Sequence, residues 1–168
     1  MSIIDFNNDL LPKTRFSVAI TGNRLLSKDD ESKIFETIKF IVTNPNVNSI
    51  YFGGAIGADT VALKSALNII CLEKPKLVVV VPNTLKDQPK QTQNTSEFAD
   101  ELVELKNIIT ASDGYRSYQI RNEYMVDHAD VTISFWDGIQ AGGTYNCIAY
   151  ALKSGKKVFN VKIEGKDK

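Results

Sequence analysis

Short apolar runs alternate with longer segments of helical periodicity along most of the chain. Runs of β-branched and other apolar residues predict buried strands, and we expect them over residues 16–21, 49–52, 76–81, 131–135 and 157–161. Between them, apolar residues recur every three or four positions, as in amphipathic helices. We expect helices from the Ser27 cap to Asn44, and over about 59–72, 95–106, 118–129 and 145–153.

This alternation predicts an α/β fold: a Rossmann-like, open and mainly parallel sheet with helices on both faces, in three α/β/α layers. The run "KLVVVV" at 76–81 is continuously apolar, as expected for a strand covered on both faces. We predict a single domain over 16–161, preceded by an arm (1–15) and followed by a charged tail (162–168). A polar loop over 83–94 and a short strand at 108–110 complete the expected elements.

Composition narrows the class of protein. The 168 residues suffice for one large core, and the formal net charge is zero. A globally basic nucleic-acid-binding protein is therefore not indicated, although a local basic patch stays open. The apolar runs are far shorter than a membrane span, and residues 1–14 lack the pattern of a signal peptide. With Cys71 and Cys147 expected as reduced thiols, we predict a cytoplasmic protein without a membrane partner.

Glycines follow the predicted strands at the edge of the sheet where ligands bind in such folds. Gly22 precedes Asn23 and Arg24, and the second strand leads into "GGAIGAD" at 53–59. Glycine allows close approach of a ligand, and the next helix offers free amides to a phosphate. Neither a dinucleotide fingerprint nor a P-loop is in register. A tight turn capped by Asp59 is the alternative.

A second such junction is "WDGIQAGGT" at 136–144. Thr144 would cap the following helix or donate its hydroxyl to a phosphate oxygen. Trp136 would stack on a base or close the core. Asp137 would accept from a ribose hydroxyl, act as a base, or satisfy the turn.

Arg121 stands near the start of a predicted helix, where a cation is mildly unfavourable, which indicates an anionic partner. The alternative is a solvated arginine that pairs with Glu123 or Asp127. The lone histidine, His128, is not expected to act directly, and no metal site is predicted. No arrangement of a serine or cysteine nucleophile with a histidine indicates acyl-transfer chemistry.

Five segments, in this order, resemble the SLOG superfamily, which includes LOG-type phosphoribohydrolases, DNA-processing protein A and YpsA-like proteins. They read "VAITGNR" at 18–24, "FGGAIGADTVAL" at 52–63, "VVVVP" at 78–82, "YQIRNEYMVDHAD" at 118–130 and "GGT" at 142–144. The resemblance implies a nucleotide or a nucleotide-derived signalling ligand, and no required cofactor. Carried over by position, the ligand-binding residues would be Gly22, Asn23, Arg24, Gly53, Gly54, Gly57, Asp59, Arg121, Asn122, Gly142, Gly143 and Thr144, beside Trp136.

The chain departs from the LOG motif PGGxGTxxE. Ala141 replaces the proline, and no carboxylate follows Thr144 at the motif's spacing. The leading hypothesis is therefore a nucleotide-binding or sensor domain. An N-glycosidic hydrolase or (deoxy)ribosyltransferase is the second, because such chemistry needs a carboxylate near the sugar, and the candidates are Asp137, Glu123 and Asp59.

Binding of single-stranded DNA is the third hypothesis, and the neutral net charge disfavours it. Aromatic residues such as Tyr118 would serve as stacking platforms. The basic residues would be scattered lysines: Lys86, Lys90, Lys153, Lys156 and Lys157. Association into a homo-oligomer is also expected.

Overall fold

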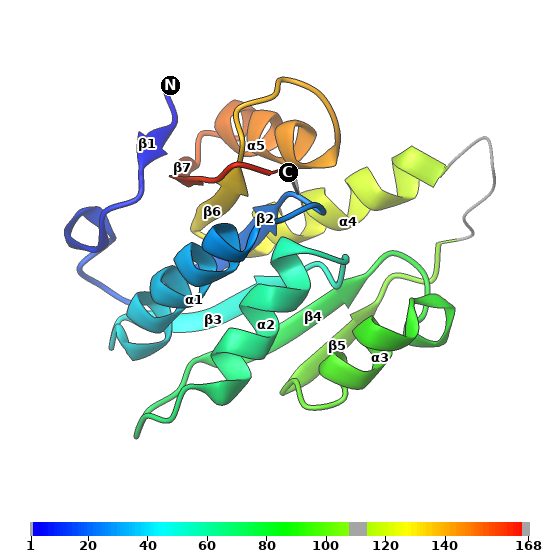
Figure 1. The fold of residues 1–168 in the computed structure, drawn as a ribbon, viewed down its shortest axis with the longest axis horizontal. Helices are drawn as coiled ribbons and strands as arrows, with labels where there is room; N and C mark the ends of the chain where they lie inside the picture. The colour runs from blue at the N-terminus through cyan, green and yellow to red at the C-terminus, as the bar shows by residue number, and fades with distance from the viewer. Residues whose placement is uncertain (1, 108–113, 166–168) are drawn as a thin grey trace.

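The computed structural model describes residues 2–107 and 114–165, which form a seven-stranded sheet (Figure 1). Its strands pair in parallel throughout, in the spatial order β1-β7-β6-β2-β3-β4-β5. The bounds are β1 (Ile4–Asp5), β2 (Phe16–Gly22), β3 (Val47–Phe52), β4 (Lys76–Val81), β5 (Glu101–Glu104), β6 (Val131–Trp136) and β7 (Lys157–Lys162). The predicted Rossmann-like α/β fold is confirmed.

Helices cover both faces of the sheet, which gives the three expected layers (Figure 1). One face carries α1 (Lys28–Thr43), α2 (Ala58–Asn68) and α3 (Lys90–Ser96), and the other carries α4 (Gly114–His128) and α5 (Gly143–Lys153). Two short 3-10 turns, η1 (Asn8–Leu10) and η2 (Leu85–Asp87), complete the described elements.

Strand β4 shows why its sequence is continuously apolar. Val79 and Val81 belong to the core cluster under α1 and α2, whereas Val78 and Val80 join the cluster that contains Met125 of α4. Successive side chains of a strand point to opposite faces, so a strand between two helical layers needs apolar residues at every position.

The N-terminus of α1 is fixed by a reciprocal cap, as the sequence predicts. The hydroxyl of Ser27 accepts from the N–H of Asp30 (3.1 Å), and the Asp30 carboxylate accepts from the N–H of Ser27 (3.0 Å). The same carboxylate accepts from the N–H groups of Glu164 (2.9 Å) and Gly165 (3.0 Å). Burial alone would raise the pKa of Asp30, but these donors outweigh burial and lower it. Residues 163–165, expected in a tail, are thus bound to α1.

The predicted arm over 1–15 contains a strand that the sequence analysis did not anticipate. Ile4 and Asp5 pair with Phe159 and Asn160 of β7, and Leu11 is buried. Strand β7 would otherwise have an unpaired edge, and this short strand satisfies its backbone groups.

The prediction was wrong between 83 and 106, where a loop and a helix over 95–106 were expected. The structure places α3 at Lys90–Ser96 and then β5 at Glu101–Glu104. Strand β5 pairs with β4, and the Asp100 carboxylate accepts from the N–H of Leu77 (2.8 Å) at the start of that pairing. Pairing with a distant strand therefore overrides the local helical spacing. The strand expected at 108–110 lies outside the described residues.

Two helix boundaries also differ. Helix α2 ends at Asn68 rather than near 72, so Cys71 lies beyond it. Helix α4 begins at Gly114, ahead of the expected start at 118. The second difference matters for the site, because Arg121 is then two turns from the helix start.

Candidate functional site

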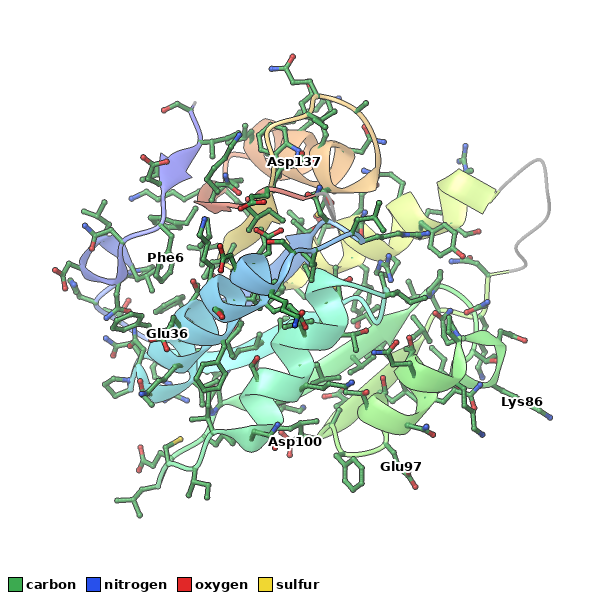
Figure 2. The ribbon with its side chains drawn as sticks, viewed as in Figure 1. Phe6, Glu36, Lys86, Glu97, Asp100 and Asp137 are labelled. Carbon is green, nitrogen blue, oxygen red and sulfur yellow. The ribbon has the colours of Figure 1, made fainter. Side chains whose placement is uncertain are left out.

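A cavity of about 620 Å³ opens at the carboxyl edge of the sheet, where the chain order reverses. From β2 the chain passes to α1 on one face, and from β6 to α5 on the other, so a crevice separates the two connections. Figure 2 shows Asp137 beside the β6 to α5 connection, on the opposite side of the molecule from Asp100. The cavity is lined by Thr21, Gly22, Asn23, Arg24, Ala55, Asp59, Tyr118, Gln119, Arg121, Asn122, Trp136, Asp137, Ile139, Ala141, Gly142, Gly143, Thr144 and Asn146.

Most residues that the sequence singles out line this one cavity. Those that do not line it are Gly53, Gly54, Gly57 and Glu123. Several lining residues were not predicted from the sequence, and three of them are polar: Thr21 at the end of β2, and Gln119 and Asn146 on the helices. Helical spacing was the signal for the last two, because Gln119 lies three residues before Asn122 and Asn146 lies three residues after Gly143.

The glycines of the junction between β3 and α2, which spans residues 53–57, are packed against protein. The backbone oxygen of Gly53 accepts from the Arg121 guanidinium, and that of Gly54 accepts from the Thr92 hydroxyl (2.8 Å). Gly57 has φ +96°, and a Cβ there would lie 2.5 Å from Arg24 Cα and 2.6 Å from Asn23 O. These glycines support the cavity from behind.

The junction between β6 and α5, residues 137–143, is open. Gly142 is the N-cap of α5 with φ +95°, and no side chain caps the helix. A Cβ at Gly142 or Gly143 would meet no atom within 4 Å. Since the first N–H groups of a helix have no intrahelical partner, the first turn of α5 presents free donors beside the cavity. Thr144 lies on the cavity but is not the helix cap.

Arg121 is 5% exposed, which rules out the solvated arginine that pairs with Glu123 or Asp127. Its Nε donates to the side-chain oxygen of Asn122 (3.0 Å), and its guanidinium donates to Gly53 O. Burial lowers the pKa of Arg121 and the nearby Asp59 raises it, and an arginine stays charged at neutral pH. Arg121 does not lie at the start of α4, so the helix dipole gives no reason to expect an anionic partner. The burial of its charge does give one.

Tyr118 lies between two cations on the cavity wall. The guanidinium carbons of Arg24 and Arg121 are each 5.8 Å from the centre of its ring. Such cation–π contacts orient the guanidinium groups without neutralising them. The two positive charges thus stay available to a ligand.

Asp59 is the poorly compensated charge of the cavity. It is 7% exposed, its Oδ2 accepts only a long bond from the N–H of Ala55 (3.4 Å), and its Oδ1 has no partner. Burial raises the pKa of Asp59 to about 6, although Arg121, the Ala55 N–H and Arg24 pull it down. A Cβ on Gly53 would lie 2.9 Å from Asp59 Oδ2 and 3.0 Å from the Arg121 guanidinium carbon, so Gly53 leaves room for both groups.

Asp137 joins the two connections across the crevice. Its Oδ2 accepts from the Asn23 side-chain amide (2.8 Å), and its Oδ1 accepts from the N–H of Ile139 (3.0 Å). Both oxygens therefore have protein partners, which agrees with the turn-satisfying alternative. Glu123 is half-buried outside the cavity.

Trp136 is 8% exposed and packs against Cys147 and Ile148, and its indole N–H donates to Ile139 O (3.0 Å). It closes the core while one part of it lines the cavity. Base stacking on a free indole face is therefore less favoured than the sequence analysis allowed.

Across residues 2–107 and 114–165, no cluster of three or more histidine, cysteine or acidic residues has the arrangement of a metal site. Within the same ranges, no helix is both long and apolar enough to cross a membrane.

No family model matches the chain. It is 26% identical over 144 residues to the uncharacterized SPbeta prophage-derived protein YoqJ of Bacillus subtilis, covering 74% of this chain and 81% of that protein. Among solved structures, DNA processing protein A (DprA) of Streptococcus pneumoniae superposes with a TM-score of 0.69 at 19% identity. DprA of Helicobacter pylori, whose structure concerns its mode of binding single-stranded DNA, superposes with a TM-score of 0.68 at 21% identity.

The chain has the fold of DprA. The alignments cover 88% and 90% of this chain, but 50% of the Streptococcus pneumoniae chain and 70% of the Helicobacter pylori chain. The chain thus spans half the length of the first of these relatives. At these identities the likeness shows the fold alone, and membership of the SLOG superfamily or of any of its branches stays a prediction.

Proposed function

We propose that the cavity binds a nucleotide or a nucleotide-derived ligand, with a phosphate held between the first turn of α5 and Arg121. One observation carries the proposal: the uncapped start of α5, at Gly142 and Gly143, opens into the same cavity as a buried arginine.

The two features are complementary in charge to a phosphate. Free amides and the helix dipole favour an anion at the start of α5. A buried cation is costly unless an anion compensates it. The hydrogen-bond partners of Arg121, Gly53 O and the Asn122 side chain, are neutral, and the nearby Asp59 is not in direct contact with it. Arginine binds phosphate oxygens in pairs, which adds geometric selectivity.

The remaining space suits a nucleoside. A cavity of about 620 Å³ lies within the range that small ligands and cofactors occupy. Asn23, Gln119, Asn122 and Asn146 offer hydrogen-bonding groups without charge, and Tyr118 offers an aromatic ring. No cofactor is required by this proposal.

Binding is favoured over N-glycosidic cleavage, which stays the enzymatic alternative. Asp137 would have to give up its bond from Asn23 before it could act on a sugar, and Glu123 lies outside the cavity. Turnover of nucleoside monophosphates, detected by chromatography, would support the enzymatic hypothesis.

Calorimetric titration of Arg121→Met tests the proposal. Methionine keeps much of the side-chain volume and removes the charge-assisted contact, so nucleotide affinity should fall by about tenfold or more. Arg116→Met is the matched control, because Arg116 is an exposed arginine of the same helix. Equal affinities of the two variants would contradict the proposed phosphate position. Circular dichroism would check that Arg121→Met folds, since the residue is buried.

Binding of single-stranded DNA across the same edge is the remaining candidate, and the shared DprA fold favours it. The phosphate position described above would then hold a backbone phosphate. The lysines do not converge on the cavity, however. Lys156 donates to the carbonyls of Val126 (2.6 Å), Asp127 (3.2 Å) and Ala129 (2.7 Å), and Lys86 projects far from Asp137 (Figure 2).

Fluorescence anisotropy with a labelled oligothymidylate of about 16 nucleotides separates the two candidates. Tight binding with a steep salt dependence, unaffected by free mononucleotides, would favour DNA. Weak binding that mononucleotides compete away would favour the nucleotide site. Self-association stays a prediction that analytical ultracentrifugation would test.

A further inference from the structure

We propose that Asp59 binds the ligand as a neutral acid, so that the cavity takes up a proton together with the phosphate. The proposal rests on the proposed function above and assigns to Asp59 a specific role within that site. A protonated carboxyl group donates its O–H to a ligand oxygen, whereas an ionised carboxylate repels the anion.

The surroundings of Asp59 carry the proposal. The side chain is more than nine-tenths buried on the cavity wall, and one oxygen has no partner in the described part of the chain. The other has a single long bond from a backbone N–H. In the ranges that the structure describes, the ion pair within 4 Å is the exposed one between Lys76 and Glu101, so Arg121 and Asp59 are not in direct contact. A buried carboxylate with so few donors is easily protonated.

A phosphate in the cavity completes the argument. It would compete with Asp59 for the same two cations, Arg121 and Arg24, and a second negative charge nearby disfavours the ionised form of the buried Asp59. A phosphate on α5 keeps most of its charge, because free amides surround it there. The proton therefore goes to Asp59, whose pKa already lies at about 6 in the free protein.

Several other titratable groups face this part of the cavity. Arg24 follows β2, Tyr118 and Arg121 come from α4, and Asp137 follows β6. Cys147 of α5 does not line the cavity, but it is buried near enough to interact electrostatically with Asp59 and Arg121. Burial raises the pKa of Cys147 to about 12, so its thiol stays protonated at neutral pH. Asp137 has donors on both oxygens. Asp59 is the group in this set whose charge a second anion changes most.

Calorimetry in buffers of different ionisation enthalpy measures the protons taken up. The probes are the four ribonucleoside 5′-monophosphates, with inorganic phosphate as the anion without a nucleoside. The phosphate monoester itself titrates near pH 6, so the informative quantity is the difference between wild type and Asp59→Asn. Wild type should take up more protons per nucleotide, and its affinity should fall by up to about tenfold per pH unit relative to the variant between pH 6 and 8.

The amide of asparagine imitates the neutral acid, because it has nearly the same shape and can donate. Asp59→Asn should therefore bind at pH 8 at least as tightly as wild type, with little remaining proton linkage. Asp29→Asn is the matched control, since Asp29 is exposed in the first turn of α1. Thermal unfolding verifies that both variants fold.

The outcomes separate the two proposals. A loss of affinity of about tenfold or more in Asp59→Asn at pH 8 would show that the ionised carboxylate accepts from the ligand, and would overturn the neutral-acid role. Equal proton uptake by wild type and variant would overturn it as well. Either result, with Arg121-dependent binding intact, leaves the nucleotide site standing. Failure of every nucleotide and of phosphate to bind wild type would overturn both.

Discussion

The two junctions that carry glycines share a positive φ at the start of their helices but have different surroundings. Gly57 and Gly142 are both N-caps, with φ of +96° and +95°, and neither helix has a side-chain cap. Gly57 lies against the backbone of Asn23 and Arg24, whereas Gly142 has open space where a side chain would stand.

The difference shows that one residue type serves two purposes at the same edge of the sheet. At the β3–α2 junction, the absence of side chains lets protein segments approach one another and makes room for Arg121 and Asp59. At the β6–α5 junction, it leaves backbone donors accessible. The first junction holds the charges of the site, and the second presents the amides.

The largest effect expected is that of Gly57→Ala. Both the positive φ and the overlap with the Arg24 backbone oppose a methyl group, so the free energy of unfolding should fall by at least about 3 kcal/mol. Urea denaturation followed by circular dichroism measures this. A loss below about 1 kcal/mol would mean that the junction is not packed as described.

Asp59→Asn should stabilise the protein at neutral pH by an amount on the order of 2 kcal/mol. The pKa of Asp59 is about 6 in the folded protein, above its ordinary value, so the folded state binds the proton more tightly than the unfolded state. Wild-type stability should therefore fall as pH rises from about 4 to 6 and then level off. The variant should lack this decline. Parallel pH profiles would show that Asp59 is well compensated.

Gly142→Ala should cost about 1–2 kcal/mol, because the backbone conformation alone is unfavourable for alanine. The comparison with Gly57→Ala then shows how much crowding, together with the difference in ψ (-128° against -176°), adds at nearly equal φ. A cost as large as that of Gly57→Ala would show that the open space at α5 is filled in solution.

Gly143→Ala should have the smallest effect on stability, within about 0.5 kcal/mol of wild type. Its φ lies outside the positive region, and an added methyl group meets no protein atom within 4 Å. Nucleotide affinity should nevertheless fall several-fold in calorimetry, because the methyl group stands where the phosphate approaches the amides. Unchanged affinity would place the ligand elsewhere in the cavity.

The central part of the fold could be predicted because its sequence signals are local. The apolar run at β4 and the glycines after β3 and β6 can be recognised from the local sequence alone. They predict a parallel sheet with a ligand site at the carboxyl ends of its strands. Strand β5 could not be predicted in this way. Phe98, Leu102 and Leu105 also have helical spacing, and only the free edge of β4 selects the strand.

The candidate site was predictable by residue type and not by environment. The sequence indicates Arg121 and Asp59 as polar residues near glycines, but their burial depends on segments more than 60 residues away along the chain. The crowding of Gly57 likewise depends on another segment of the chain, because it comes from Asn23 and Arg24 in the loop after β2. Which glycine is packed and which is accessible is a property of the assembled sheet.

The attachment of Glu164 and Gly165 to Asp30 has a practical consequence. Gly165 lies against the side chains of Asn23 and Asp137, at the rim of the cavity. A fluorophore or purification handle joined after Gly165 would therefore start beside the binding region and disturb the titrations. One joined ahead of β1 would start at the outer strand of the sheet, next to β7, and is the better choice for those experiments.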